Sequence, residues 1–230
     1  MTNINSPTTA LNRFGFGARY DLSEANRKAI ASDPRAYLKS ELVPERALLS
    51  GPDLNSSRIN LLTTFAEQER RRMQRDQTMQ ANAAPGGMVP RPAMDPAPMA
   101  LQGPTKQGQP MQGQTQSRDV FRDILFAEAG ARWQKGFADP SGLIERLVWF
   151  WSNHFAVSMA KGQQVHATAG SYEREAIRPF ILGKFGDMLK AVEQHPTMLF
   201  FLDNRTSIGP NSKAGKNQKK GLNENLRAKF

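Results

Sequence analysis

Residues 144–158 read "IERLVWFWSNHFAVS", a stretch in which tryptophan and phenylalanine run directly into Ser152-Asn153-His154. Asp139-Pro140, a capping residue followed by proline, predicts a helix over residues 140–156. At 3.6 residues per turn, most apolar side chains of this helix fall on one broad face. We therefore expect a central helix that its neighbours cover on most sides. The broad face holds Leu143, Ile144, Leu147, Phe150, Trp151, His154 and Phe155, and the opposite side holds Glu145, Trp149 and Ser152.

Two residues of this predicted helix are candidates for function. Trp149 points away from the main apolar face, which indicates a second packing surface or a ligand contact, because an indole stacks on a sugar or a base. His154 lies on the apolar face itself. A histidine in that position is more often a hydrogen-bonded core side chain than a metal ligand or a base. We therefore interpret His154 as a structural histidine at the core or its rim.

The apolar residues outside this helix also have helical spacing, and several segments begin at a capping residue. No segment shows the alternation of period two that is typical of a strand. The sequence thus predicts an all-α fold, an irregular helical bundle. The further helices are expected between Pro7 and Gly15, over Ser23–Ser32 and Pro34–Val43, and over residues 54–80, 118–136, 172–178, 184–195 and 197–202.

The segment 54–80 changes character along its length. It begins as an amphipathic pattern with Leu61, Leu62 and Phe65 as apolar anchors, and then becomes polar on every side. A helix without an apolar face is usually solvated or frays into a linker. We therefore interpret the arginines at 70–72 as a solvated face and not as a phosphate-binding cluster.

Residues 81–117 have a different composition from the rest of the chain. Proline, glycine, glutamine and methionine supply 22 of the 37 positions, and the segment has no aromatic residue and no periodicity. Such a segment cannot bury enough apolar surface to offset the entropy lost on ordering. We therefore expect a long disordered Pro/Gly/Gln/Met-rich insertion, which separates the N-terminal helices (1–80) from the helical core (118–204).

The net charge of +10 is distributed unevenly along the chain. Residues 118–204 carry ten basic and ten acidic groups, whereas residues 205–230 carry seven basic groups and one acidic group. The last segment therefore reads as a basic flexible tail after the neutral core. Nucleic-acid binding by a folded surface needs the charge clustered on that surface, so a nucleic-acid partner is not expected.

Several classes of protein are excluded or disfavoured by what the chain lacks. There is no cysteine, which excludes disulfides, thiolate metal sites and cysteine nucleophiles. The N-terminus has no basic start followed by an apolar stretch, so no signal peptide is predicted and a cytoplasmic location is the default. The apolar runs are too short for a membrane span.

No catalytic or metal-binding motif stands out either. The chain contains no GxSxG and no HExxH. The combination of His154 and His166 with Glu173 or Glu175 matches no compact ligand spacing, so no metal site is predicted, and the sequence indicates no particular cofactor. We place His166 in a loop, and His195 at a helix end where its imidazole satisfies the last carbonyls.

Longer stretches of the sequence carry a resemblance. The words "ALNRFGFGAR", "WFWSNHFAVS", "YEREAIRPFILGKFGDMLKAVEQHPTMLFFLDNRTSIGPNS" and "GLNEN" occur in the order seen in the bacterial domain of unknown function 1800 family. The sequence resembles that family over about residues 1–20 and 118–226. Its motif directs attention to Trp151, Asn153, His154, Arg174, Glu175, Asp203, Asn204, Asn223, Glu224 and Asn225.

The resemblance implies a predominantly helical bacterial protein without an established activity. Family members are often exported, so export is an expectation beside the cytoplasmic default. They are often encoded beside another uncharacterised family, which implies a partner protein from the same operon. In the family, the motif "NEN" opens a further helix and a long second half, whereas here it is followed by Leu226–Phe230. We therefore expect an N-terminal fragment of a longer member, and a one-base deletion in the gene would produce this ending.

Two functions are the main alternatives at this point, and RNA or DNA binding through residues 205–230 is a less favoured third. The first is a binding or scaffolding role, with contacts from Trp149, Asn153, Arg174, Asn204 and Asn223. The second is an enzyme domain, hydrolytic or metal-assisted, whose site is completed by the second half of the family. In that case the polar contributors are His154, Glu175 and Glu224.

Overall fold

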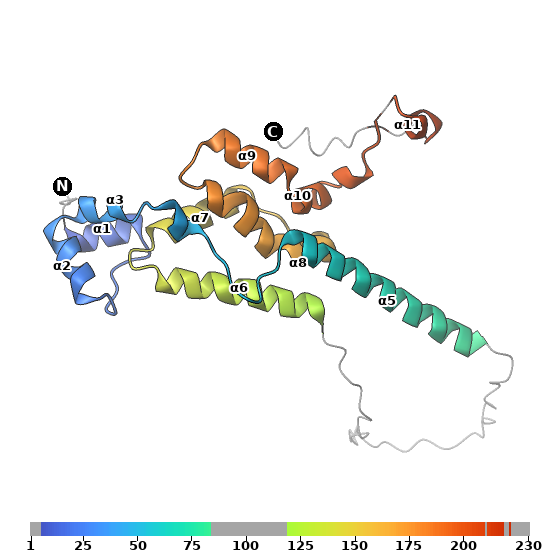
Figure 1. The fold of residues 1–230 in the computed structure, drawn as a ribbon, viewed down its shortest axis with the longest axis horizontal. Coiled ribbons are helices and arrows are strands. Elements are labelled where there is room, and N and C mark those ends of the chain that lie inside the picture. Colours follow the sequence, from blue (N-terminus) through green and yellow to red (C-terminus); the bar gives the residue numbers. More distant parts are fainter. Residues whose placement is uncertain (1–5, 84–118, 210, 219–220, 222–230) are drawn as a thin grey trace, which may run out of the picture. The chain divides into compact units, whose positions relative to one another are not determined.

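The computed structural model describes residues 6–83, 119–209, 211–218 and 221, and every regular element in these ranges is helical. Figure 1 shows their order along the chain. The chain divides into two units, Met1–Thr64 with Val120–Phe230, and Phe65–Asp119. The α-helices are α1 Pro7–Phe14, α2 Glu24–Ser32, α3 Pro34–Ser40, α4 Pro44–Ala47, α5 Ser57–Ala83, α6 Val120–Ala138, α7 Leu143–His154, α8 Gln163–Tyr172, α9 Phe185–Gln194, α10 Pro196–Phe201 and α11 Lys213–Gln218. Shorter helical turns occupy Met159–Lys161, Glu173–Ile177, Arg178–Phe180 and Asn204–Thr206. The all-α prediction is confirmed.

The N-terminal helices begin where their capping residues predict. The Ser23 hydroxyl accepts a hydrogen bond from the backbone of Asn26 at 3.2 Å, and the Asp33 carboxylate accepts from the backbones of Arg35 and Ala36. Each of these bonds satisfies an amide that the first helical turn leaves without a partner. The three helices enclose a small core of Ala10, Leu11, Leu22, Ile30, Tyr37 and Leu38, against which Leu143 packs.

Helix α7 begins at Leu143, three residues after the predicted start. Its N-cap is Gly142, with a left-handed φ of 73°, and a Cβ there would lie 2.7 Å from the ring of Phe16. Both the backbone conformation and the close contact therefore require glycine at 142. Two side chains accept from amides of the first turn of α7. The Ser141 hydroxyl accepts from the backbone of Leu143 at 3.2 Å, and the carboxylate of Asp139, the predicted capping residue, accepts from the backbone of Glu145 at 3.5 Å.

The buried face of α7 also differs from the prediction. Ile144, Glu145 and Val148 are buried, whereas Phe150 is 60% exposed and His154 is exposed. The prediction had placed Glu145 on the solvent side and Phe150 and His154 on the covered side, and at these three positions it was wrong. A carboxylate can occupy a core position when a buried cation pairs with it, and Arg178 supplies that cation.

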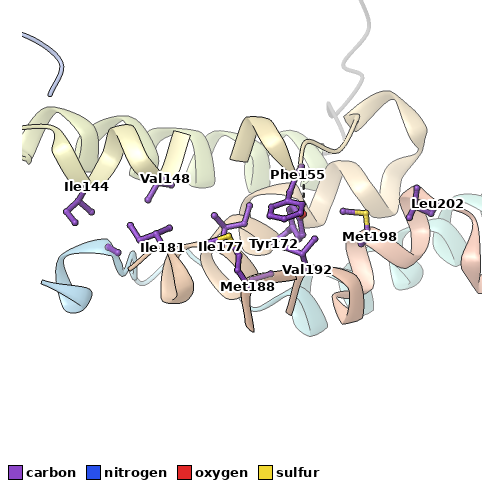
Figure 2. Packing of buried hydrophobic residues seen from close by; sticks show 12 residues of the cluster. Ile144, Val148, Phe155, Tyr172, Ile177, Ile181, Met188, Val192, Met198 and Leu202 are labelled. Carbon is purple, nitrogen blue, oxygen red and sulfur yellow. Dashed lines mark hydrogen bonds between the residues drawn. The ribbon is translucent and has the colours of Figure 1, made fainter. Parts of the chain in front are cut away.

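The main core lies between α7, α8, α9 and α10, and Figure 2 shows its labelled side chains lying between these segments. The Tyr172 hydroxyl donates to the backbone carbonyl of Phe155 at 3.0 Å, which ties the end of α8 to the residue after α7. Of the apolar residues predicted to face the core from the helix over 184–195, Met188 and Val192 are buried here, whereas Phe185 is 50% exposed. The same core contains Ile144, Val148, Ile177, Ile181, Met198 and Leu202.

Helix α8 lies where the sequence predicted a loop. It begins at Gln163, so His166 is helical, and Ser171, expected to open a helix at 172, is buried inside it. The Ser171 hydroxyl donates to the carbonyl of Thr168 at 3.0 Å. Helices α6 and α8 lie side by side (Figure 1), and a Cβ on Gly170 would come within 2.5 Å of Glu128. Gly170 thus permits close packing of the two helices.

Helix α5 includes the segment that changes character. Leu62 and Phe65, predicted as apolar anchors, are exposed, and the buried residues of this first part are the polar Ser57, Asn60 and Thr64. In the second unit the helix continues to Ala83, three residues beyond the predicted end. There Glu67 pairs with Arg70 and Arg71 at 2.7 and 2.6 Å, and these pairs lower the pKa of Glu67 to about 2.

The predicted disordered insertion, residues 81–117, lies outside the described residues except for the last turn of α5. Within the predicted basic tail, the described part contains Asn204–Thr206 and α11, and the remainder lies outside the description. No helix among the described residues is long and apolar enough to span a bilayer.

Candidate functional site

Two sets of polar or aromatic side chains are candidates for a functional site. The first lies around the wide turn Glu173–Ile177, a π-helical segment that follows α8. A π-turn inserts an extra residue, so consecutive side chains leave the helix in directions that a regular helix does not offer. Glu173, Arg174 and Glu175, which are consecutive in this turn, each contact a different part of the chain.

Arg178 forms the centre of a fully buried network. Its guanidinium donates to both oxygens of Glu145 at 2.7 and 2.9 Å, to Oε1 of Glu173 at 3.0 Å, and to the carbonyl of Ala47 at 2.9 Å. Burial lowers the pKa of Arg178, but the hydrogen bonds and charges of the two carboxylates outweigh it and hold that pKa above its ordinary value. The Arg178 guanidinium therefore stays charged. Its partners among the described residues are Glu145, Glu173 and the carbonyl of Ala47, all of them buried.

The other oxygen of Glu173 is also occupied. Oε2 accepts from the Ser152 hydroxyl at 2.8 Å and lies 2.8 Å from Nε of Arg132. Arg174 forms a two-bond pair with Glu128 at 2.9 and 2.7 Å, and it also donates to the carbonyl of Asn55. These carboxylates and guanidinium groups hold α6, α7 and the segment after α8 together.

Glu175 joins the start of α5 to His195. It accepts from the Ser57 backbone at 2.8 Å and from the Ser57 hydroxyl at 2.6 Å, and Nε2 of His195 lies 3.0 Å from its Oε2. The other ring nitrogen, Nδ1, accepts from the backbone of Thr197 at 3.2 Å. Since Nδ1 accepts, Nε2 carries the proton, and the ring is neutral.

His195 was predicted to satisfy the last carbonyls of a helix, and this was wrong. It caps the N-terminus of α10, because its unprotonated Nδ1 can accept from an amide. Burial lowers the pKa of His195, against the opposing effect of Glu175. Both nitrogens are therefore engaged, and neither is available to take a proton from a ligand.

The second set is a pocket of about 540 Å³ that we call the aromatic pocket. The rings that line it come from the turn after α1, from α6 and from α7: Phe16, Tyr20, Trp133, Phe137 and Trp149. The Phe16 and Trp149 rings are 4.6 Å apart, and Trp133 meets Trp149 edge-to-face at 5.4 Å. Trp133 and Phe137 stack at 6.0 Å and are 52% and 67% exposed. The pocket therefore presents several ring surfaces to solvent around one partly buried indole.

The rim of the aromatic pocket is polar. Arg19 donates to both oxygens of Asp21, at 2.8 and 2.5 Å, and to the carbonyl of Asp139 at 2.9 Å. The hydrogen bond from Arg19 lowers the pKa of Asp21, so this carboxylate is ionised at neutral pH. With Asp139, the lining carries two carboxylates and one guanidinium.

Comparison with known families gives one result. The family described as "Protein of unknown function (DUF1800)" matches residues 9–227, which is nearly the whole chain. The chain belongs to this family. No curated protein and no solved structure matches it. The predicted resemblance to DUF1800 is therefore confirmed.

The structure places the predicted site residues of this DUF1800 chain in different surroundings. Trp149 lines the aromatic pocket. Arg174 and Glu175 belong to the paired groups of the π-turn, and Glu175 hydrogen-bonds His195 rather than His154. His154 and Asn153 are exposed at the end of α7, and His154 is not the partly buried histidine that was predicted.

The other predicted site residues lie near or beyond the limits of the description. The Asn204 side chain accepts a hydrogen bond from the Ser207 hydroxyl at 2.6 Å. Asn223 and Glu224 fall outside the described residues. Among the residues that are described, no group of three His, Asp or Glu side chains is arranged to hold a metal ion.

Sequence reasoning missed the partners of Trp149 in this DUF1800 chain. Phe16 was read only as part of a turn between two glycines, and Trp133 and Phe137 were not singled out. The signal was present, because 133 and 137 are four residues apart and so share one side of α6. The buried pair of Glu145 and Arg178 had no comparable signal, since 33 residues separate its members.

Proposed function

We propose that this DUF1800 chain is a binding protein, and that its ligand is a carbohydrate held in the aromatic pocket. The observation that carries the proposal is the group of exposed rings around Trp149. A ligand site is typically a cavity of several hundred cubic ångströms, lined by apolar and aromatic groups with a few polar groups that fix orientation. The aromatic pocket, at about 540 Å³, has this composition.

The rings suit a sugar because a pyranose has one face of C–H groups. That face stacks on an aromatic ring, and the exposed surfaces of Trp133 and Phe137 are available for such contact. The ring hydroxyls of the sugar then point outward from the stack, where they meet polar groups of the protein.

The rim suits a sugar because hydroxyls both donate and accept hydrogen bonds. Asp21 and Asp139 supply acceptors, and the Arg19 guanidinium supplies donors, so the rim matches both roles of a hydroxyl pair. A nucleotide fits less well, because the two carboxylates against one guanidinium disfavour a phosphate.

The alternative of a hydrolytic or metal-assisted enzyme has less support. Of its three candidate residues, Glu175 uses both oxygens on Ser57 and His195, and His154 is exposed at the end of α7. A general base needs a free position within hydrogen-bond reach of the substrate. The paired groups around the π-turn instead bind one another.

The test is a titration of the purified chain with a panel of neutral, amino and acidic oligosaccharides. We expect at least one oligosaccharide to bind in the micromolar to millimolar range. Trp133→Ala should weaken that binding at least tenfold, about 1.4 kcal/mol, because it removes a stacking surface without disturbing the core. Isothermal calorimetry gives the dissociation constants.

Phe126→Ala is the matched control, since Phe126 is an exposed aromatic residue of the same helix that does not line the aromatic pocket. It should leave sugar binding unchanged. Adenosine monophosphate and choline serve as competing ligand classes. The proposal is contradicted if no oligosaccharide binds, if the two alanine variants lose affinity equally, or if either competitor binds more tightly than every sugar.

A further inference from the structure

A second hollow lies on a different surface of the same unit, between α1, α3 and α7, and we call it the α1–α3–α7 groove. Its volume is about 340 Å³. The apolar residues that line it include Ala10, Phe14, Leu38, Leu42, Leu143 and Leu147. None of the groove-lining residues lines the aromatic pocket.

The groove continues into exposed apolar surface. Phe14 and Leu42 on its two sides are 45% and 42% exposed, and Phe150, one turn beyond Leu147 on α7, is also exposed. Exposed apolar residues that adjoin one another, in contrast to single scattered ones, mark surfaces that bind another molecule. The groove and its surroundings form such a surface on α1, α3 and α7.

The charges of the groove have one sign. Arg35 and Lys39 line it, and no acidic residue does. They are four residues apart on α3, so their like charges lie on the same side of that helix and disfavour each other. Among the described residues, neither side chain forms an ion pair. A partner with carboxylates would therefore meet two cations that no acidic residue of the groove lining neutralises.

We propose that the α1–α3–α7 groove binds an amphipathic helix of a partner protein, with apolar anchors one turn apart and carboxylates beside them. The anchors fill the space between Leu38, Leu42 and Leu147, and the carboxylates pair with Arg35 and Lys39. Two cations spaced by one helical turn match acidic residues spaced by one turn on the partner. A fatty acid has a single carboxylate, so it would leave one of the two cations without a counter-charge.

The experiment is a selection of random 16-residue peptides displayed on phage against the purified chain. Peptides that also bind the Arg35→Glu/Lys39→Glu variant are removed in each round. Enriched sequences should combine apolar residues at i and i+4 or i+7 with two or more acidic residues. A synthetic copy of the best peptide should bind the charge-reversed variant at least tenfold more weakly, and its affinity should fall as salt is raised.

Arg27→Glu/Lys28→Glu is the matched control, because it reverses two exposed charges of α2 that do not line the groove. It should bind the synthetic peptide like the wild-type chain, as should Phe126→Ala. The proposal is overturned if no peptide is enriched, if the enriched peptides lack acidic residues, or if both charge-reversed variants lose binding alike. Saturable binding of dodecanoate that Leu147→Ser abolishes, without any enriched peptide, would assign the groove to a fatty acid instead. Sugar binding is measured separately and is independent of every outcome.

Discussion

Arg178 has no exposed side-chain surface, yet it carries a full charge. A buried charge is tolerated only when partners replace the water it has lost. The two bonds to Glu145, the bond to Glu173 and the bond to the Ala47 carbonyl use its donors in a fixed fork geometry. The pair of Arg178 and Glu145 therefore fixes the contact between α7 and the segment after α8.

Glu145→Gln should lower the free energy of unfolding by about 3–5 kcal/mol, because it leaves the Arg178 charge with one carboxylate fewer in a buried site. Urea unfolding followed by circular dichroism measures the change. Glu24→Gln, which removes an exposed ion pair with Lys28, is the control and should cost less than about 1 kcal/mol. Equal effects of the two substitutions would mean that the buried network stabilises the chain no more than an exposed ion pair does.

His195 makes the stability of the folded chain depend on pH. Its pKa in the folded chain lies below its ordinary value, so the unfolded chain binds the proton more readily. The stability that it contributes is therefore fully present above the unfolded pKa of about 6.5, and is lost as pH falls through the folded value. Protonating Nδ1 also removes the acceptor for the Thr197 amide.

The chain should accordingly lose stability between pH 7.5 and pH 5.5, and His195→Asn should reduce that loss. Asparagine keeps an acceptor suited to capping α10 but does not titrate. Unfolding free energies of both proteins at the two pH values provide the comparison. A variant with an undiminished pH dependence would show that another group is responsible.

At this same scale, sequence reasoning identified some residues and missed others. Trp149 was found because its position on α7 separated it from the apolar face. Glu145 was placed on the solvent side because a carboxylate is normally exposed, and only the distant Arg178 overrides that preference. Pairings between residues far apart in sequence leave no local signal.

Among the elements, α6 and α8 pack closely where Gly170 meets Glu128. Gly170→Ala should destabilise the chain by about 1–3 kcal/mol, because the added methyl group overlaps the Glu128 side chain, which is itself held by Arg174. Thermal unfolding measures the change.

Gly130→Ala provides the opposite case, since nothing lies within 4 Å of a Cβ at that position of α6. It should stabilise the chain by up to about 1 kcal/mol through helix propensity alone. A Gly170 variant that gains stability like the Gly130 variant would contradict the close packing of the two helices.

Element boundaries were predictable where the capping signal is local. Ser23 and Asp33 cap their helices as expected, because their hydroxyl and carboxylate bond to amides two or three residues away. The start of α7 was not predictable, because it depends on the contact between Gly142 and Phe16. Helix α8 was missed because three of its five buried positions, Ala167, Thr168 and Ser171, hold small or polar residues that give no apolar periodicity.

For the molecule as a whole, α7 connects the core with both proposed surfaces. Ile144 and Val148 point into the main core, Trp149 lines the aromatic pocket, and Leu143 and Leu147 line the α1–α3–α7 groove. The fold class and the core helices α7, α9 and α10 were predictable from periodicity, whereas α8 was not. The two surfaces were not, because each is assembled from helices that are distant in sequence.

The central claim, that the aromatic pocket binds a sugar, is tested most directly by fluorine NMR. The chain has three tryptophans, so a sample labelled with 5-fluorotryptophan gives three resonances, assigned by single replacements with phenylalanine. Saturation with the tightest oligosaccharide of the panel should shift Trp133 and Trp149 and leave Trp151 unchanged, because Trp151 packs among Phe150, Phe155 and Phe185 away from the pocket lining. A shift confined to Trp151, or no shift at saturation, would contradict the account.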